Sequence, residues 1–458
     1  MTTIVLTSKK NLVWSSMQEI IPFVCLSWTK TQDEKHQVYT FDVDEESFAE
    51  KKEIFLKAEQ IVLSCFTPNV ARIATFLRFE LSLNVRFLIH VHNQASIAFW
   101  PFRHWGHTDL FQQHDIFISS CSRDADCIRK TYPTAQVEIV PFSYSWIYEN
   151  TIPKLTLTEQ INLMFIGRLS SQKNLHTLLL SLHLLKKKQK NINWHFTFIG
   201  SADHLGSPNM GFKDDHYDTY LKKLTIDLKL DDQVTFLGQL QRDEIDQILS
   251  RQKIIFVSPS LHSDENFGMA AFRALIGGHN AVLSDWGGHA DFKSKFSDQV
   301  TLVKVNSGPA IDPAQLSDGL YSSLLSYQKD NTKSIDPYYL MPNIVNKCKM
   351  LIVTEWNSEK TLLTSSVADL ILERAKKSVL LGQQKIFDSY SDPLKTDFFV
   401  SYGMTDMHSE AKNSTLVPWA IENQNSYIVF DPHRGHQNLE KNLESRKWLI
   451  QQGYFYEN

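Results

Sequence analysis

The sequence lacks the features that mark disulfide-rich, zinc-stabilised, secreted and membrane-spanning proteins. Its 5 cysteines among 458 residues include no Cys-x-x-Cys pair, so we expect reduced thiols and no metal site. The N-terminal stretch MTTIVLTSKKNLVW has no cationic segment followed by a long apolar run, so we expect no secretory signal. No window approaches the roughly 18 apolar residues of a membrane-spanning helix. We therefore expect a cytoplasmic protein, and composition leaves a peripheral membrane contact open.

The chain also lacks an excess of either charge. Its 47 Lys and Arg residues oppose 51 Asp and Glu residues, which gives a net charge of -4, so nucleic acid is not an expected partner. Hydrophobic residues make up 42% and charged residues 21%, as in an ordinary globular protein. A chain of this length predicts two or three domains. It gives no indication of an oligomeric state.

Short apolar runs separated by helical patterns occur in two rounds along the chain. Continuous apolar and β-branched runs are typical of strands buried on both faces of a parallel sheet. The candidate strands are residues 2–8, 38–43, 60–66, 85–91, 115–121, 137–142, 161–167, 194–200, 233–238, 253–260, 280–285 and 299–305. Helical segments between them, such as residues 44–59, would supply the crossovers.

This rhythm predicts an α/β protein with two doubly wound, Rossmann-like domains that face each other across a cleft. The first domain would span residues 1–150 and the second residues 151–345, with a linker near residues 146–160. Residues 346–458 are expected to form a helical C-terminal extension, to which the sequence assigns no role.

The stretch GRLSSQKN, which begins at Gly167, combines a glycine at a strand end with two cations on the way into a helix. Glycine permits close approach of a ligand to the backbone. Arg168 and Lys173 beside a helix N-terminus would make a pocket suited to a diphosphate. The alternative is that both are surface cations at the start of a helix.

The stretch DENFGMAAFRAL places Glu265 on a loop after a strand, and Phe267, Gly268 and Met269 open the next helix. Backbone N–H groups at such a helix start are unsatisfied and can receive phosphate oxygens. Glu265 would repel phosphate, so we expect it to accept hydrogen bonds from sugar hydroxyls. A carboxylate that only stabilises the helix N-terminus is the alternative.

Together, GRLSSQKN and SPSLHSDENFGMAAFRALIGGHNAVLSDWGG resemble the donor half of the family 4 retaining glycosyltransferases, which have the two-domain GT-B fold. The resemblance covers roughly residues 110–305. It implies an enzyme, a hexosyltransferase-like transferase, that moves a sugar from a nucleotide-diphosphate donor to an acceptor that the sequence does not identify. The nucleotide sugar would be a substrate, and no cofactor is expected.

The resemblance also implies roles for individual residues. The catalytic group would comprise His92, Arg168, Lys173 and Glu265, with the two cations on the diphosphate and the carboxylate on the transferred sugar. Further donor-site residues would be Gly167, Gly200, Ser201, Gly238, Gln239, Leu240, Asn266, Phe267, Gly268, Met269 and Arg273. Ser15, Ser16 and Asn93 would lie on the acceptor side.

The sequence departs from the family pattern in two places. Arg273 stands eight positions after Glu265, where the family carries a second carboxylate that accepts hydrogen bonds from the ribose. Arginine has only donors, so it would pair with a neighbouring acid, reach a phosphate, or leave the ribose to another acceptor such as Glu244. Ser15 and Ser16 stand where two glycines are common.

Other interpretations stay open at this point. His90 and His92 lie two apart on a strand end and point to one face, where they could be buried structural histidines or part of a metal site. The fold could also be a non-catalytic relic that binds a sugar, a nucleotide or a protein, or a sugar-nucleotide epimerase. No Ser/His/Asp or Cys/His arrangement indicates a hydrolase.

Overall fold

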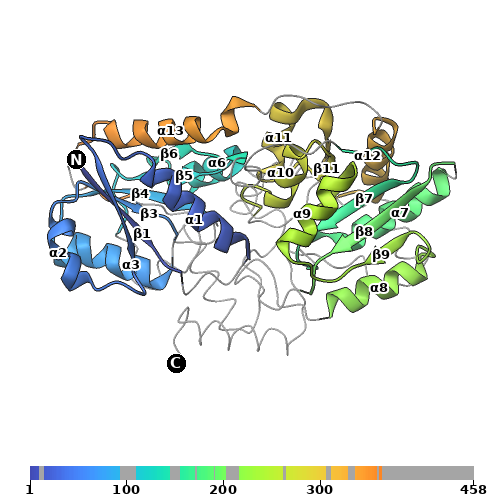
Figure 1. Cartoon of the computed structure of the whole chain (residues 1–458), viewed down its shortest axis with the longest axis horizontal. Helices are drawn as coiled ribbons and strands as arrows, with labels where there is room; N and C mark the ends of the chain where they lie inside the picture. Colours follow the sequence, from blue (N-terminus) through green and yellow to red (C-terminus); the bar gives the residue numbers. More distant parts are fainter. Residues whose placement is uncertain are drawn as a thin grey trace. The chain divides into compact units, whose positions relative to one another are not determined.

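The protein consists of two compact α/β units. The computed structural model describes residues 1–9, 15–65, 67–92, 110–144, 155–170, 173–189, 191–202, 216–260, 265–305, 311–327, 336–357 and 361–363. Residues up to 144 together with residues 336–363 belong to the first unit, and residues 155–327 belong to the second (Figure 1). The predicted extension beyond residue 363 lies outside this description, as does Asn93. Among the described helices, none combines the length and the apolar character needed to cross a membrane.

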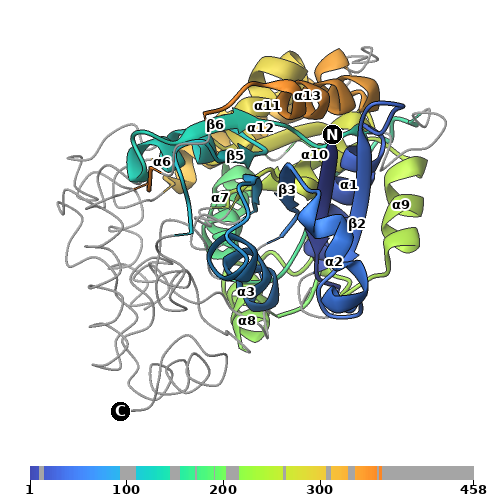
Figure 2. The same ribbon diagram turned by 90° about the vertical axis from the view of Figure 1, so that its left-hand side faces the viewer.

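The first unit is built on a parallel sheet of six strands in the order β2-β1-β3-β4-β5-β6. The strands are β1 (Thr2–Thr7), β2 (Gln37–Asp42), β3 (Gln60–Leu63), β4 (Arg86–Val91), β5 (Ile116–Ser119) and β6 (Gln136–Ile139). Its helices are α1 (Ser15–Thr29), α2 (Phe48–Leu56), α3 (Pro68–Thr75) and α6 (Ser122–Thr131), which flank the sheet (Figure 2). Strands β3, β4 and β5 are buried at every position, because parallel strands are covered on both faces.

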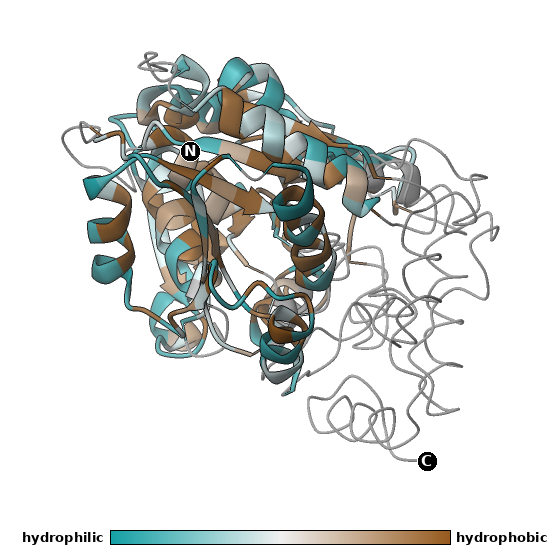
Figure 3. Ribbon diagram, turned by 90° about the vertical axis from the view of Figure 1, so that its right-hand side faces the viewer, coloured by the Kyte–Doolittle hydropathy of each residue, from teal (hydrophilic) through white to brown (hydrophobic). Residues whose placement is uncertain are grey.

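The second unit repeats the plan with the strand order β12-β11-β10-β7-β8-β9, again all parallel. The strands are β7 (Ile161–Ile166), β8 (Trp194–Ile199), β9 (Val234–Phe236), β10 (Ile254–Ser258), β11 (Asn280–Ser284) and β12 (Val300–Val303). The helices are α7 (Leu175–Lys188), α8 (Tyr217–Asp227), α9 (Arg242–Arg251), α10 (Met269–Ile276), α11 (His289–Phe296) and α12 (Pro313–Leu325). The helices alternate between hydrophilic and hydrophobic colour, as expected when one face packs on a sheet (Figure 3).

Each of the twelve predicted strands is present, and the prediction of two doubly wound α/β units is confirmed. The apolar runs predict the strands well because eight of the twelve lie inside the sheets, where most side chains are removed from water.

The chain returns to the first unit after α12. Helix α13 (Met341–Val353) crosses the boundary predicted at residue 345 and packs against α1. Its last carbonyls are occupied by side chains from the first sheet: the Gln60 amide donates to Ile352 O at 2.6 Å, and the Arg86 guanidinium donates to Thr354 O at 2.9 Å. These two bonds satisfy acceptors that a helix C-terminus leaves without an intrahelical partner.

Beyond α13 the structure departs from the helical pattern of the sequence. Residues 354–357 and 361–363 are not helical. Gln113 N donates to Thr361 O at 2.8 Å, and Leu363 N donates to Phe111 O at 3.0 Å, so the chain forms a short antiparallel bridge instead. Tertiary hydrogen bonds override the local preference here.

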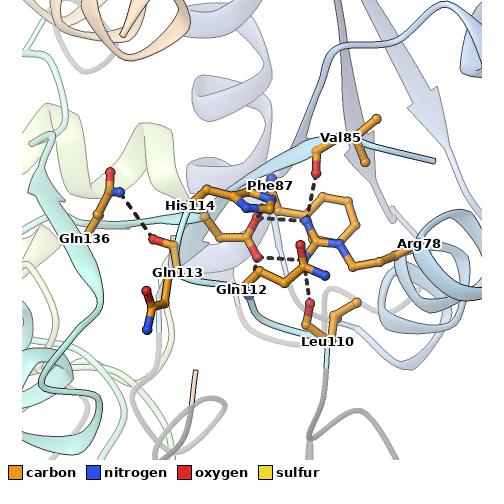
Figure 4. Close-up of polar contacts among 9 residues, drawn as sticks. Arg78, Val85, Phe87, Leu110, Gln112, Gln113, His114 and Gln136 are labelled. Atoms are coloured by element: carbon orange, nitrogen blue, oxygen red, sulfur yellow. Dashed lines mark hydrogen bonds and ion pairs between the residues drawn. The ribbon is translucent and has the colours of Figure 1, made fainter. Parts of the chain in front are cut away.

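A buried ion pair fastens the turn after α3 to the sheet of the first unit. The side chains of Arg78 and Asp115 are 3% and 0% exposed. Arg78 Nη1 and Nη2 donate to the two Asp115 oxygens at 2.6 and 2.8 Å, and Nη2 also donates to Val85 O at 2.8 Å. The backbone N–H groups of Phe87 and Gln112 donate to the same carboxylate, both at 2.8 Å (Figure 4). The pair is therefore well supplied with partners.

Replacing Asp115 with alanine is expected to destabilise the protein by about 3–5 kcal/mol, because the Arg78 charge would stay buried without a counter-ion. Urea denaturation measures the change. Asp126→Ala, which removes an exposed carboxylate 3.0 Å from Arg129, is the matched control and should cost less than about 0.5 kcal/mol. Equal effects of the two substitutions would contradict the structural role of the buried pair.

Candidate active site

The strand order of the second unit places a topological switch point between β7 and β10. The chain runs from β7 through β8 to β9 on one side and then crosses to β10 on the other side of β7. In open parallel sheets, ligands bind beyond the carboxyl ends of the strands at such a point. The loops that follow β7 and β10 are those that contain the predicted residues Lys173 and Glu265.

Glycines end the three strands on one side of this point. Ile166 and Ile199 are paired in register, so Gly167 and Gly200 follow side by side. Gly167 N donates to Ile199 O at 2.9 Å, and Gly200 N donates to Gly238 O at 2.8 Å. A Cβ at Gly200 would lie 1.8 Å from Gly167 O, so only glycine allows this approach.

The loops after β8 and β9 are joined by one further side-chain bond. Ser201 Oγ donates to Gln239 Oε1 at 3.1 Å. Leu240 follows in the same loop, immediately before the helix α9 that Gln241 caps. The structure thus brings together the predicted donor-site residues at the ends of β7, β8 and β9.

Lys173 and Glu265 meet across the switch point. Lys173 Nζ lies 2.5 Å from Glu265 Oε2, and the two side chains are 17% and 11% exposed. Lys173 Nζ also lies 3.4 Å from Ser260 Oγ, just beyond the end of β10. Arg168 is half-buried on the loop after β7, five positions before Lys173. The sequence predicted both ends of this pair but not that they bind each other.

Glu265 leads directly into the start of α10. Gly268, the residue before this helix, has a left-handed φ of 82°, and its carbonyl accepts from Phe272 N at 2.9 Å. Phe267 is buried against Phe272 and Phe292. The first backbone N–H groups of α10, beginning with Met269, have no intrahelical acceptor and are suited to an anion. Asn266 is buried in the same turn.

A turn with two glycines, Gly287 and Gly288, follows β11 and contacts the loop that contains Glu265. Gly288 N donates to Glu265 O at 2.8 Å. A Cβ at Gly287 would lie 2.2 Å from Glu265 O, and one at Gly288 would lie 2.5 Å from Asn266 O. The two backbones are therefore in direct contact, which requires glycine at both positions.

His289 completes a closed ring of polar contacts that the sequence did not predict. Its Nε2 lies 3.8 Å from Glu265 Oε1, and its Nδ1 lies 3.2 Å from Ser284 Oγ. Ser284 Oγ in turn donates to Ser260 O at 2.6 Å. Lys173 closes the ring through its contacts with Glu265 and Ser260. A histidine directly after a Gly-Gly pair at a strand end was the only signal available.

Burial and the charge of Lys173 determine the protonation states of Glu265 and His289. Burial raises the pKa of Glu265, but the charge of Lys173 and its hydrogen bond outweigh burial and hold that pKa well below its ordinary value. Glu265 is therefore ionised. Burial lowers the pKa of His289 to about 4, so this imidazole is neutral at pH 7.

Arg273 pairs with a neighbouring acid. Its Nη1 donates to Asp246 Oδ1 at 2.8 Å, which joins α10 to α9. Arg242 Nε lies 3.7 Å from the other oxygen of this carboxylate. Glu244, named above as an alternative ribose acceptor, instead accepts from the backbone N–H of Gln241 at 2.7 Å and caps α9.

The predicted residues of the first unit lie at the carboxyl edge of its own sheet or just beyond it. His92 Nε2 donates to Ser64 O at 2.8 Å, and burial lowers the pKa of His92 to about 4. The rings of His90 and His92 stack with centroids 5.8 Å apart, so they do lie on one face. Ser15 is the first residue of α1, and Ser16 is exposed beside it. No cluster of three potential metal ligands occurs among the described residues.

Both units are α/β units with parallel sheets. The second unit has a switch point lined by glycines, with a lysine and a helix N-terminus beside it, and these features suit an anionic ligand. Residues 148–311 match the family model described as Glycosyl transferases group 1. The match lies within the second unit, so this unit is similar to a group 1 glycosyltransferase domain.

Solved structures of other proteins share the fold. HepE from Anabaena in complex with UDP is 14% identical, with a TM-score of 0.51 over 77% of this chain and 98% of that one. A structure from E. coli described as trehalose-6-phosphate bound with UDP-2-fluoro glucose is 11% identical, with the same TM-score and coverage. No curated protein matches the chain significantly in sequence. The shared architecture is the GT-B fold.

Proposed function

We propose that the second unit binds a nucleoside diphosphate sugar and that the protein transfers this sugar with retention of configuration. The observation that carries the proposal is the contact of Lys173 with Glu265 across the switch point, beside the start of α10. A cation and free backbone N–H groups suit a diphosphate, and an ionised carboxylate suits sugar hydroxyls. The complexes of similar structures with UDP and with UDP-2-fluoro glucose support a nucleotide sugar as the donor.

In this proposal the diphosphate lies against Arg168, Lys173 and the N-terminus of α10. The bond between the sugar and the diphosphate breaks with its electron pair on the phosphate, and the cations stabilise that developing charge. The departing phosphate oxygen takes the proton of the acceptor hydroxyl, whose oxygen forms the new bond on the same face of the sugar. No separate nucleophile and base pair is then needed.

Lys173 would exchange partners when the donor binds. In this structure its ammonium pairs with Glu265. A bound diphosphate draws this cation by charge, and the sugar hydroxyls replace it as donors to the carboxylate. Donor binding thus satisfies both halves of an ion pair that is already largely removed from water.

Asp246 is our proposed replacement for the ribose acceptor that the resemblance predicts at position 273. Its carboxylate pairs with Arg273, and its side chain remains 30% exposed, so its oxygens can still accept hydrogen bonds from a ligand. The roles of His92, Asn93, Ser15 and Ser16 stay predictions from the resemblance, and the cytoplasmic location stays a prediction from the composition.

Calorimetric titration with UDP, GDP and a panel of their hexose derivatives tests the proposal. One nucleoside diphosphate is expected to bind with a dissociation constant in the micromolar range, and its hexose derivative should release nucleoside diphosphate when incubated with acceptors. A protein that binds neither nucleotide would instead be a relic of the fold. The full chain can be used for this titration. A second measurement on the same sample is its melting temperature, which ligand binding raises.

A further inference from the structure

His289 and Glu265 present two hydrogen-bond acceptors to the same small region of the site. Oε2 of Glu265 is held by Lys173, the Ser260 hydroxyl also bonds this carboxylate, and Oε1 faces Nε2 of His289 at 3.8 Å. An ionised carboxylate can only accept hydrogen bonds. The nature of this contact therefore depends on which nitrogen of His289 carries the hydrogen.

The partners of Ser284 assign that hydrogen. A hydroxyl has a single hydrogen, and Ser284 donates it to Ser260 O at 2.6 Å. Toward His289 Nδ1, 3.2 Å away, Ser284 Oγ can then only accept, so the hydrogen of the neutral ring is on Nδ1. His289 Nε2 therefore carries no hydrogen and can only accept, and it faces Glu265 Oε1, which is also an acceptor.

The position of this nitrogen is fixed by its surroundings. The His289 side chain is 2% exposed, and its backbone N–H donates to Trp286 O at 3.1 Å. The ring lies so close to Gly268 that a Cβ there would be 2.7 Å from its Cδ2 atom. Nε2 is thus preorganised relative to Glu265.

We propose that His289 Nε2 and Glu265 Oε1 together bind two neighbouring hydroxyl groups of the transferred sugar, which makes His289 a specificity-determining residue. This inference rests on the proposed function and concerns the sugar half of the same site. Two facing acceptors repel each other until donors lie between them, and a contact that only stabilised the loop would pair a donor with an acceptor. A vicinal pair of hydroxyls supplies one donor to each atom.

The consequence is selection for a sugar with two adjacent free hydroxyls. A hexose that lacks one of them leaves a desolvated acceptor without a donor, which costs more than the lost bond itself. The base and the diphosphate are not involved, so bare nucleoside diphosphate should be insensitive to His289.

The test compares three variants by calorimetry with the hexose nucleotide that the wild type binds most tightly. The measured quantity is the ratio of the dissociation constants of bare nucleoside diphosphate and hexose nucleotide. His289→Leu is expected to lower this ratio about 10-fold and to leave the affinity for bare nucleotide within about 2-fold. His289→Gln should restore part of the ratio, because its amide oxygen can accept near the place of Nε2.

Ser284→Ala is the most discriminating variant because it deletes neither acceptor. Without the Ser284 hydroxyl, His289 can carry its hydrogen on Nε2 and donate it to Glu265, so the ratio should fall although the His289 and Glu265 side chains are both still present. His195→Gln is the matched control, because this half-buried histidine on β8 only contacts Thr235 Oγ1, at 2.9 Å. Melting temperatures verify that each variant is folded.

Monodeoxy hexose nucleotides complete the design. In the wild type, removal of either of two adjacent hydroxyls should weaken binding about 10-fold, and His289→Leu should become indifferent to one of the two. The inference is wrong if His289→Leu keeps the wild-type ratio and the wild-type response to every deoxy analogue, or if no hexose nucleotide binds more tightly than bare nucleotide. Absence of any nucleotide binding would overturn the proposed function as well.

Discussion

Replacing Lys173 with alanine is expected to lower donor turnover by about 100- to 1,000-fold, because the charge that stabilises the departing diphosphate is lost. Arg168→Ala should have an effect of similar size if both cations face the diphosphate. The affinity for bare nucleoside diphosphate should fall about 10- to 100-fold, since charge-assisted hydrogen bonds are removed. Nucleoside diphosphate release and calorimetry measure the two quantities.

Stability must be separated from function in this experiment. Lys173→Ala alone leaves Glu265 largely buried without a cation, which could destabilise the unit by about 3–5 kcal/mol. The double substitution Lys173→Met with Glu265→Gln removes both charges and should be folded but inactive. Lys188→Ala is the control, because its ammonium pairs with the exposed Asp318 at the far end of α7. Full activity of both Lys173→Ala and Arg168→Ala would refute the assignment of the diphosphate.

The second unit is expected to lose about 4 kcal/mol of stability between pH 7.5 and pH 5.5. Burial lowers the pKa of His176, His279 and His289 from 6.5 to about 4. Below pH 6.5 these histidines bind protons in the unfolded chain but stay neutral in the folded unit. The free energy of unfolding therefore falls as the pH falls, down to about pH 4. At pH 5.5 each histidine costs about 1.4 kcal/mol, and three cost about 4 kcal/mol.

Urea denaturation followed by the fluorescence of the buried Trp194 and Trp286 measures this loss. Stability should be nearly constant between pH 7 and 8, because the histidines are neutral in both states there. His279→Asn keeps an acceptor for Ile254 N, which now donates to Nδ1 at 3.2 Å, and should remove about one third of the pH dependence. A urea midpoint that is the same at pH 7.5 and 5.5 would show that these histidines titrate normally.

The strands and the two ends of the Lys173–Glu265 pair could be predicted from the sequence because their signals are local. A buried parallel strand is a continuous apolar run, and a glycine at a strand end followed by cations before a helix is a local pattern suited to a diphosphate. The contact between Lys173 and Glu265 required the strand order, which places β10 beside β7 and which no local pattern encodes.

Other features depend on tertiary partners and were not predictable. His289 lies 24 positions after Glu265, and only the contact of the Gly287–Gly288 turn with residues 265–267 brings the two side chains together. The partner of Arg273 was foreseen only as a neighbouring acid, and Asp246 on α9 could not be distinguished from Glu244 by spacing.

The hydrogen bonds that Arg86 and Gln60 donate to the C-terminal end of α13 also determine which segments of the chain could be produced separately. In topological terms the second unit is an insertion into the first, since the six strands of the first unit precede it and α13, which belongs to the first unit, follows it. A single excised segment around residues 155–327 would therefore contain every described strand of the second unit. The strands of the first unit also lie in one segment, residues 1–144, but cutting the chain before α13 would remove a helix from that unit.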